Sequence, residues 1–273
     1  MKERSLVVFT LLAQLAVGVF WVSGGLDSWP GYKMALLAAP VLMALGMLAS
    51  FFHLGSPLNA WRAFSNLRSS WLSREVLCSV LFAGASGLVA ALEWFELAPA
   101  AVHNAIVWTT ALLGLALISS MANAYRARTV PAWDTWATPI SFFTTSLLLG
   151  GLAVGAMLAF DPAAPTELIR LALRRIAVGS IVLLGVQLIV VSLWLARLAG
   201  EPGAAARAAA RVTQEHRLIL RLRFALAILG MAAAGIGLFA WGASATILAF
   251  VLVLASEVLG RVLFYEARER YGV

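Results

Sequence analysis

Hydrophobic residues in this chain form eight long runs, separated by short stretches that are polar or contain proline and glycine. The runs lie at residues 5–26, 33–53, 75–95, 102–125, 137–160, 173–197, 218–240 and 245–265. Each has close to the roughly 20 residues that an α-helix needs to cross a bilayer, and none shows the period-two alternation of barrel strands. The pattern predicts an all-α fold, a polytopic membrane bundle of eight transmembrane helices that forms a single domain, residues 1–273.

The breaks between the runs contain residues that interrupt helices. Examples are Trp29-Pro30-Gly31, Gly55-Ser56-Pro57 and Glu201-Pro202-Gly203. The shortest break is Trp241-Gly242-Ala243-Ser244. We place a helix boundary there because the 42 residues from 224 to 265 are too many for one crossing. An Ala/Arg-rich segment, 203–217, is expected to form a short helix at the membrane interface.

Composition supports a lipid environment. Hydrophobic residues make up 62% of the chain, charged residues only 12%, and the mean hydropathy is +0.91. Soluble domains carry roughly 25% charged residues. The first run follows Lys2 and Arg4 as in a secretory signal, but it continues to about Leu26 without a convincing cleavage site, so we expect a retained helix.

The basic residues predict the orientation. With eight crossings, both termini share one side with the loops after the second, fourth and sixth runs. That side carries fifteen lysines and arginines, the other side four, and Arg261 lies within the last run. Because basic loops stay in the cytoplasm, we expect both termini to be cytoplasmic. The basic residues of these loops account for the net charge of +7, so the charge does not indicate nucleic-acid binding.

Histidine and cysteine are too few for most resident cofactors. The single Cys78 cannot hold an iron–sulfur cluster alone and is expected to be a small buried residue. Two axial haem ligands must both be buried and must lie at the same depth in the membrane. No two of His53, His103 and His216 are expected to meet both conditions. We therefore expect no haem, iron–sulfur cluster or metal site on this chain.

Polar residues within the runs are informative because each is costly in lipid. Helix directions place six of them in the same half of the membrane, the cytoplasmic half: His53, Glu75, Asn123, Arg126, Glu257 and Arg261. Glu257 and Arg261 are four residues apart on one helical face, as a structural or functional ion pair would be. Gln14 and Gln187 lie nearer mid-membrane and are expected to make contacts between helices. The six-residue set predicts a pocket that handles a polar headgroup and protons.

Several stretches resemble one known family. Residues 50–57 read Ser-Phe-Phe-His-Leu-Gly-Ser-Pro, residues 72–75 read Leu-Ser-Arg-Glu, and Glu75 follows His53 by 22 residues. Residues 129–143 agree with the same family. So does the stretch Glu257-Val258-Leu259-Gly260-Arg261 together with Phe264-Tyr265. This sequence is similar to the anchor subunit of dimethyl sulfoxide reductase, in family order and over nearly its whole length.

The resemblance implies an eight-helix anchor without a cofactor of its own, which binds a quinone (menaquinone or ubiquinone) as substrate. It implies two partners, a four-cluster ferredoxin-like iron–sulfur subunit and a catalytic subunit with a molybdenum bis-pterin guanine dinucleotide centre. His53 matches the family histidine associated with quinol binding, and Glu75 matches the carboxylate that relays protons. The expected quinone-binding residues are His53, Gly55, Ser56, Pro57, Arg74, Glu75, Asn123 and Arg126, with arginine stabilising negative charge on the bound quinone.

The basic bias departs from this family. The quinol-site loop of the dimethyl sulfoxide reductase anchor faces the periplasm, whereas the equivalent loop here is expected in the cytoplasm. Sulfite dehydrogenase (sulfite:quinone oxidoreductase), with a similar anchor, has cytoplasmic catalytic subunits. We therefore favour quinone reduction coupled to oxidation of a cytoplasmic donor such as sulfite.

Three alternatives remain at this point. They are a quinol-oxidising anchor of an S- or N-oxide reductase, a purely structural anchor, and a secondary transporter. The last is disfavoured because no internal repeat is evident and the polar residues lie near one face.

Overall fold

The computed structural model describes residues 2–24, 32–51, 66–126, 128–161, 166–239 and 243–269. These residues form nine α-helices and one short π-helix: α1 (Lys2–Ser23), α2 (Tyr32–Phe51), α3 (Trp71–Phe95), α4 (Ala100–Tyr125), α5 (Ala137–Ala159), α6 (Thr166–Gly200), α7 (Ala204–Ala210), the π-helix Arg211–Glu215, α8 (Arg217–Phe239) and α9 (Ala243–Glu266). Eight of the α-helices are long and apolar enough to cross a membrane. The predicted fold class is confirmed, including the break between α8 and α9.

Helices α3 and α6 begin at least one full turn earlier than the hydrophobic runs predicted. Helix α3 starts at Trp71 because the Ser70 hydroxyl caps it, accepting a hydrogen bond of 3.2 Å from the Ser73 N–H. Helix α6 starts at Thr166 and extends beyond its apolar run, where Glu167 and Arg170 form an ion pair of 2.9 Å on successive turns. A search for apolar runs does not detect polar helical turns at the ends of the spans.

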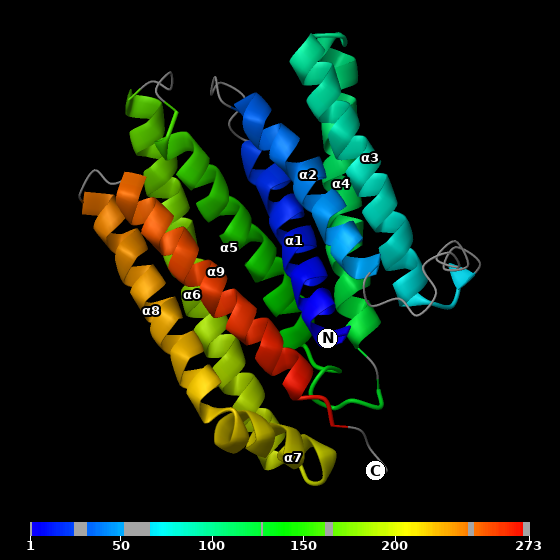
Figure 1. Ribbon diagram of the computed structural model, residues 1–273, viewed down its shortest axis with the longest axis vertical. Coiled ribbons are helices and arrows are strands. Elements are labelled where there is room, and N and C mark those ends of the chain that lie inside the picture. The colour runs from blue at the N-terminus through cyan, green and yellow to red at the C-terminus, as the bar shows by residue number, and fades with distance from the viewer. Residues whose placement is uncertain are drawn as a thin grey trace.

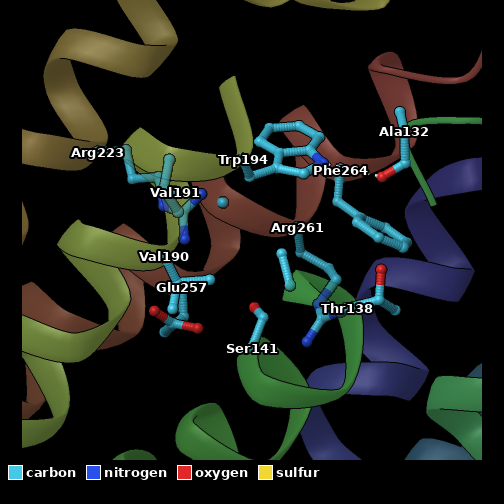
Figure 2. Close-up of a pocket in the computed structure, with 12 residues that line it drawn as sticks. Ala132, Thr138, Ser141, Val190, Val191, Trp194, Arg223, Glu257, Arg261 and Phe264 are labelled. Carbon is cyan, nitrogen blue, oxygen red and sulfur yellow. Dashed lines mark hydrogen bonds between the residues drawn. The ribbon is translucent and has the colours of Figure 1, made fainter. Parts of the chain in front are cut away.

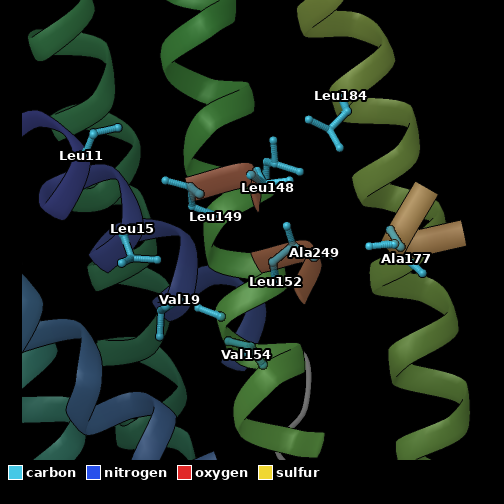
Figure 3. Packing of buried hydrophobic residues seen from close by; sticks show 14 of the residues in the cluster. Leu11, Leu15, Val19, Leu148, Leu149, Leu152, Val154, Ala177, Leu184 and Ala249 are labelled. Carbon is cyan, nitrogen blue, oxygen red and sulfur yellow. The ribbon is translucent and has the colours of Figure 1, made fainter. Parts of the chain in front are cut away.

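Helices α1 and α5 lie in the middle of the bundle (Figure 1). Helix α1 packs on α2 and α5, α3 packs on α4, and α8 packs on α9. The largest buried cluster joins Leu11, Leu15 and Val19 of α1 to Leu148 and Leu152 of α5 (Figure 3). The expectation that the first run is a helix of the bundle is met, since α1 contributes to the core along most of its length.

Large apolar side chains cover the outer surface. Trp108 of α4 is 72% exposed and Leu112, one turn further on, is 62% exposed. A surface of this kind suits hydrocarbon rather than water. Lipid would add no hydrophobic force between helices, so the bundle relies on close packing and internal polar contacts.

The closest packing joins α1 to α5 at Gly18 and Gly150. A Cβ atom added to Gly18 would overlap the carbonyl oxygen of Ser146, and one added to Gly150 would overlap the backbone of Gly18. Small residues at such a crossing let two backbones touch. The absence of a side chain at these two positions therefore sets the separation of the central helices.

The segments expected on the cytoplasmic side lie together at one end of the bundle. Helix α1 begins and α9 ends there, and residues 66–70, the segment 128–136 and α7 lie at the same end (Figure 1). We call this the α7 end. The segment 203–217 is helical as expected, and the alanines of α7 are buried against Trp194, Leu198 and Leu263.

Replacing Gly150 by alanine tests the central crossing. The new methyl group would force α1 and α5 apart, so Gly150→Ala should lower the free energy of unfolding by about 1–3 kcal/mol. Gly179→Ala on α6 is the matched control, because nothing lies within 4 Å of a Cβ there. The thermal unfolding midpoint of the purified assembly measures both, and equal midpoints would show that this crossing does not limit stability.

Candidate functional site

Buried polar side chains gather in the half of the bundle nearest the α7 end. The ionisable ones are Glu75 of α3, Arg223 of α8, and Glu257 and Arg261 of α9. Burying a charge in a bundle of this kind is costly unless the charge is paired or hydrogen-bonded. Intramembrane ionisable residues are therefore candidates for function.

Glu75 lies on the second turn of α3 and is 3% exposed. Its carboxyl group interacts electrostatically with Cys78 on the same helix and with the hydroxyls of Tyr125 and Tyr265. The sequence predicts a proton-relaying carboxylate at the beginning of this helix. The structure adds that this carboxyl group faces the interior of the bundle.

Two tyrosines within electrostatic range of Glu75 form a hydroxyl pair. The hydroxyls of Tyr125, at the end of α4, and Tyr265, at the end of α9, are 2.7 Å apart. The Tyr125 ring also packs edge-on against Trp133 and Phe264. The aromatic rings around Tyr125 keep the surroundings of the hydroxyl pair apolar, and a low local dielectric strengthens a hydrogen bond.

Trp133 forms an inner wall of this cluster. Its indole N–H donates to the carbonyl oxygen of Phe264 at 2.7 Å, and the two rings stack with centroids 5.4 Å apart. The Thr138 hydroxyl in turn donates to the Trp133 carbonyl at 2.7 Å. Trp136 instead points outward and is 40% exposed. The two tryptophans of this segment, indistinguishable by sequence, thus have different environments.

Arg261 connects three helices. Its guanidinium group donates to Gln14 of α1 at 2.7 Å and lies over the ring of Phe142 of α5, 3.9 Å from the centroid. The amide of Gln14 donates to the Phe142 carbonyl oxygen at 3.2 Å. The expected helix-packing role of Gln14 is confirmed, and the same amide also binds a buried cation.

The carboxyl group of Glu257 is bound by α5. Its Oε2 accepts a hydrogen bond of 2.5 Å from the Thr145 hydroxyl, and Gln187 donates to Thr144 and Thr145. Gln187 therefore joins α6 to α5, as a helix-packing residue should. The remaining carboxylate oxygen, Oε1, is buried and has no hydrogen-bond partner among the described residues.

The expected direct ion pair between Glu257 and Arg261 needs correction. Their side chains point to different sides of the pocket in Figure 2, and among the described residues no salt bridge within 4.0 Å joins them. Helical spacing put both residues on one face, but Thr145 and Gln14 offer each a nearer partner on a neighbouring helix. The two charges interact only at longer range.

A pocket with a cavity volume of about 40 Å³ lies between α5, α6, α8 and α9 (Figure 2). Arg223, Glu257, Arg261 and Ser141 contribute its polar groups, and Trp194 is among its apolar walls. Arg223 lies against Gly260, where a Cβ atom would come within 2.7 Å of the guanidinium carbon. The glycine between Glu257 and Arg261 thus makes room for a second buried arginine.

The other predicted site residues lie nearer the surface or outside the described residues. Arg74 donates to the carbonyl oxygens of Leu67 and Arg68 at 2.9 and 2.7 Å, and so holds the turn before α3. Asn123 donates to a backbone carbonyl within its own helix, and Arg126 lies 3.5 Å from Asp134. The remaining four, His53, Gly55, Ser56 and Pro57, fall outside the described residues.

Sequence reasoning missed the buried position of Arg223. This residue follows Arg217 and Arg221 closely, and the basic run as a whole is typical of a surface segment. Residues 221 and 223 are about 200° apart round a helix, so Arg223 faces inward where Arg221 faces outward. Helical periodicity within the basic run was the signal that could have separated them.

Metal ligands do not gather anywhere in the part of the molecule that the structure describes. No group of three His, Cys, Asp or Glu side chains there could hold a metal ion. The groups that the site does present are carboxyl, hydroxyl, amide and guanidinium. These can bind a polar headgroup by hydrogen bonds and can hold or move protons.

Comparison with known proteins gives consistent matches. The sequence is 28% identical to the YnfH chain of anaerobic dimethyl sulfoxide reductase from Escherichia coli K12, over 99% of its own length and 96% of that protein. It is 26% identical to the C chain of anaerobic dimethyl sulfoxide reductase from the same organism, with the same coverage. The C subunit of sulfite dehydrogenase from Allochromatium vinosum is 36% identical, over 47% of the present sequence and 41% of that protein.

The match at family level spans almost the whole sequence. The family described as DMSO reductase anchor subunit (DmsC) matches residues 1–267. The eight-helix bundle is thus that of a membrane anchor, and the transporter hypothesis is set aside. This chain belongs to the DMSO reductase anchor subunit (DmsC) family, and it is a membrane anchor subunit of an oxidoreductase complex.

Proposed function

We propose that this protein is the quinone-reactive subunit of its complex, exchanging electrons between the quinone pool and an iron–sulfur subunit. The observation that carries the proposal is the buried carboxyl group of Glu75, within electrostatic range of the Tyr125–Tyr265 hydroxyl pair near the α7 end. Quinone chemistry joins electron transfer to proton transfer at two ring oxygens. A buried acid and a hydroxyl donor at one depth are the groups that such chemistry needs.

The residues of this protein have separate tasks in the proposal. Glu75 gives or takes the proton at a quinone oxygen and exchanges it with the aqueous phase near the start of α3. Tyr125 offers a hydroxyl group for orientation. Arg261, behind the tyrosine pair, provides a fixed positive charge that favours negative charge on the headgroup. His53 is proposed, from the sequence motif alone, to hydrogen-bond the second oxygen.

We place the iron–sulfur partner, a four-cluster ferredoxin-like subunit, against the α7 end. The exposed Arg68, Arg128 and Arg217 lie at this end and suit an electrostatic interface. Electron transfer falls steeply with distance, so quinone must react just beneath the docked subunit, and Glu75 lies at that depth. The molybdenum bis-pterin guanine dinucleotide catalytic subunit would contact the partner rather than the lipid-facing helices.

Two directions of electron flow have support. The basic bias supports a cytoplasmic position for the α7 end, with the protein in a bacterial or archaeal inner membrane. Together with the similarity to a sulfite dehydrogenase subunit over about half the sequence, this favours quinone reduction by a cytoplasmic donor such as sulfite. The similarity to dimethyl sulfoxide reductase chains over 99% of the sequence supports the second candidate, in which quinol is oxidised to reduce an S- or N-oxide.

Glu75→Gln is the central test of the proposal. Glutamine keeps the size of the side chain but cannot exchange a proton, so quinone-linked turnover should fall by about 100-fold or more in an assembled complex. Glu93→Gln is the matched control, since Glu93 lies on the same helix at the opposite end, beside His103. Full quinone turnover in assembled Glu75→Gln would reject Glu75 as the proton-transferring group.

His53→Ala tests the headgroup contact inferred from the sequence. Loss of one hydrogen bond should weaken binding of a quinone analogue by roughly 1–3 kcal/mol, measured by titration of the purified complex. His103→Ala, at the opposite end of the bundle, should leave this affinity unchanged. If His53→Ala binds the analogue as tightly as the unmodified complex, His53 makes no bond to quinone.

Reporter fusions test the orientation. A fusion after Val273 and one within 203–217 should both report the cytoplasm, and a fusion near residue 164 should report the outside. Alkaline phosphatase and green fluorescent protein fusions give opposite signals for the two sides. An external C-terminus would reverse the orientation and favour the S- or N-oxide reductase direction.

A further inference from the structure

The pocket between α5, α6, α8 and α9 contains polar groups that the proposed quinone reaction does not use. Glu257 is 4% exposed, and only its Oε2 is hydrogen-bonded, to Thr145. Its Oε1 is buried and without a partner among the described residues, although a buried carboxylate oxygen without a hydrogen bond is energetically unfavourable. A donor that fits into the pocket would remove this cost.

Two cations lie within electrostatic range of the same carboxylate. Arg223 of α8 and Arg261 of α9 both line the pocket and both interact electrostatically with Glu257. The pocket residues of α5 and α6 are all uncharged, as are Thr145, which binds Oε2 of Glu257, and Gln187, which binds Thr145. An occupant must therefore donate to a carboxylate oxygen and accept from a guanidinium group, and water does both.

The size of the pocket agrees with water. A cavity volume of about 40 Å³ holds about three water molecules, whereas the ring of a quinone would not fit without movement of the helices. The pocket reaches from Glu257, about two and a half turns inside the end of α9, to Ala132 in the segment before α5. This segment belongs to the α7 end, where the aqueous phase begins.

We propose that this pocket is a hydrated proton-transfer site, in which a small water cluster bridges Arg223 to Oε1 of Glu257 and connects that carboxylate with the aqueous phase. A hydronium ion in the cluster gives its proton to Glu257, leaving water and a neutral carboxyl group. The return step restores the carboxylate and releases the proton to the cluster. No electron moves in either step.

The site is coupled to the proposed quinone site by charge. Arg261 interacts with Glu257 on one side and with Tyr265 and Tyr125 on the other, and both tyrosines interact with Glu75. Negative charge arriving near Glu75 would thus favour a compensating proton at Glu257, because charges are weakly screened in this interior. This coupling rests on the proposed quinone function, whereas the hydration of the pocket does not.

Hydroxyl-radical labelling of the assembled complex tests the water cluster directly. Radicals formed from bound water modify the side chains beside it, so Trp194 in the pocket should be labelled strongly. Phe9 of α1, which is equally buried at 8% exposure but lies outside the pocket, is the internal reference. Ser141→Val fills the pocket, and Ser192→Val makes the same change on an exposed face of α6.

The expected result is a several-fold loss of Trp194 labelling, relative to Phe9, in Ser141→Val and none in Ser192→Val. Equal labelling of Trp194 in the unmodified complex and in Ser141→Val would show that the pocket holds no water, and would overturn the proposal. This outcome is independent of quinone turnover, so it differs from a failure of the Glu75→Gln test.

Proton uptake tests the role of Glu257. In reconstituted complex, a pH indicator follows proton uptake during a single round of quinone reduction. Glu257→Gln should slow this uptake by about tenfold or more, whereas Glu257→Asp, which keeps an acid, should retain most of it. Co-elution with the partner subunits establishes assembly of each variant. Unchanged uptake in assembled Glu257→Gln, or equal loss in both variants, would reject proton transfer at this carboxylate.

Discussion

The guanidinium group of Arg261 must be satisfied inside a bundle that lipid surrounds, and much of the architecture follows from this requirement. Its hydrogen bond to Gln14 and its stacking on Phe142 fix α9 against α1 and α5 at once. Lipid offers no hydrogen-bond partners that could replace these contacts. The three helices therefore share one arrangement that keeps the charge paired with a polar amide and an aromatic face.

That arrangement depends on how closely α1 and α5 approach each other. Gly18 and Gly150 let their backbones touch, which brings Gln14 within hydrogen-bond distance of the Phe142 carbonyl. The tyrosine pair and the Trp133 wall then close around the end of the same helices. Close packing in the middle of the membrane and polar contacts near one end thus support each other.

The fold could be predicted from the sequence much further than the site could. Runs of about 20 apolar residues identify spans whatever their neighbours are, so all eight were located within a few residues, apart from the polar first turns of α3 and α6. The position of Glu75 near one end followed from helix direction, whereas its burial did not. Which groups pair across helices did not, because Tyr125 meets Tyr265 across 140 positions of sequence. Spacing along one helix even suggested a Glu257–Arg261 pair that neighbouring helices replace.

The contact between Gln14 and Arg261 has a consequence for biosynthesis. The two residues are 247 positions apart, so the first helix enters the membrane long before its last polar partner is made. The Gln14 NH2 group can already donate to Phe142 once α5 is inserted, but its oxygen lacks the guanidinium donor until α9 follows. A chain truncated before α9 would retain this unsatisfied oxygen inside the membrane, where quality control can recognise it.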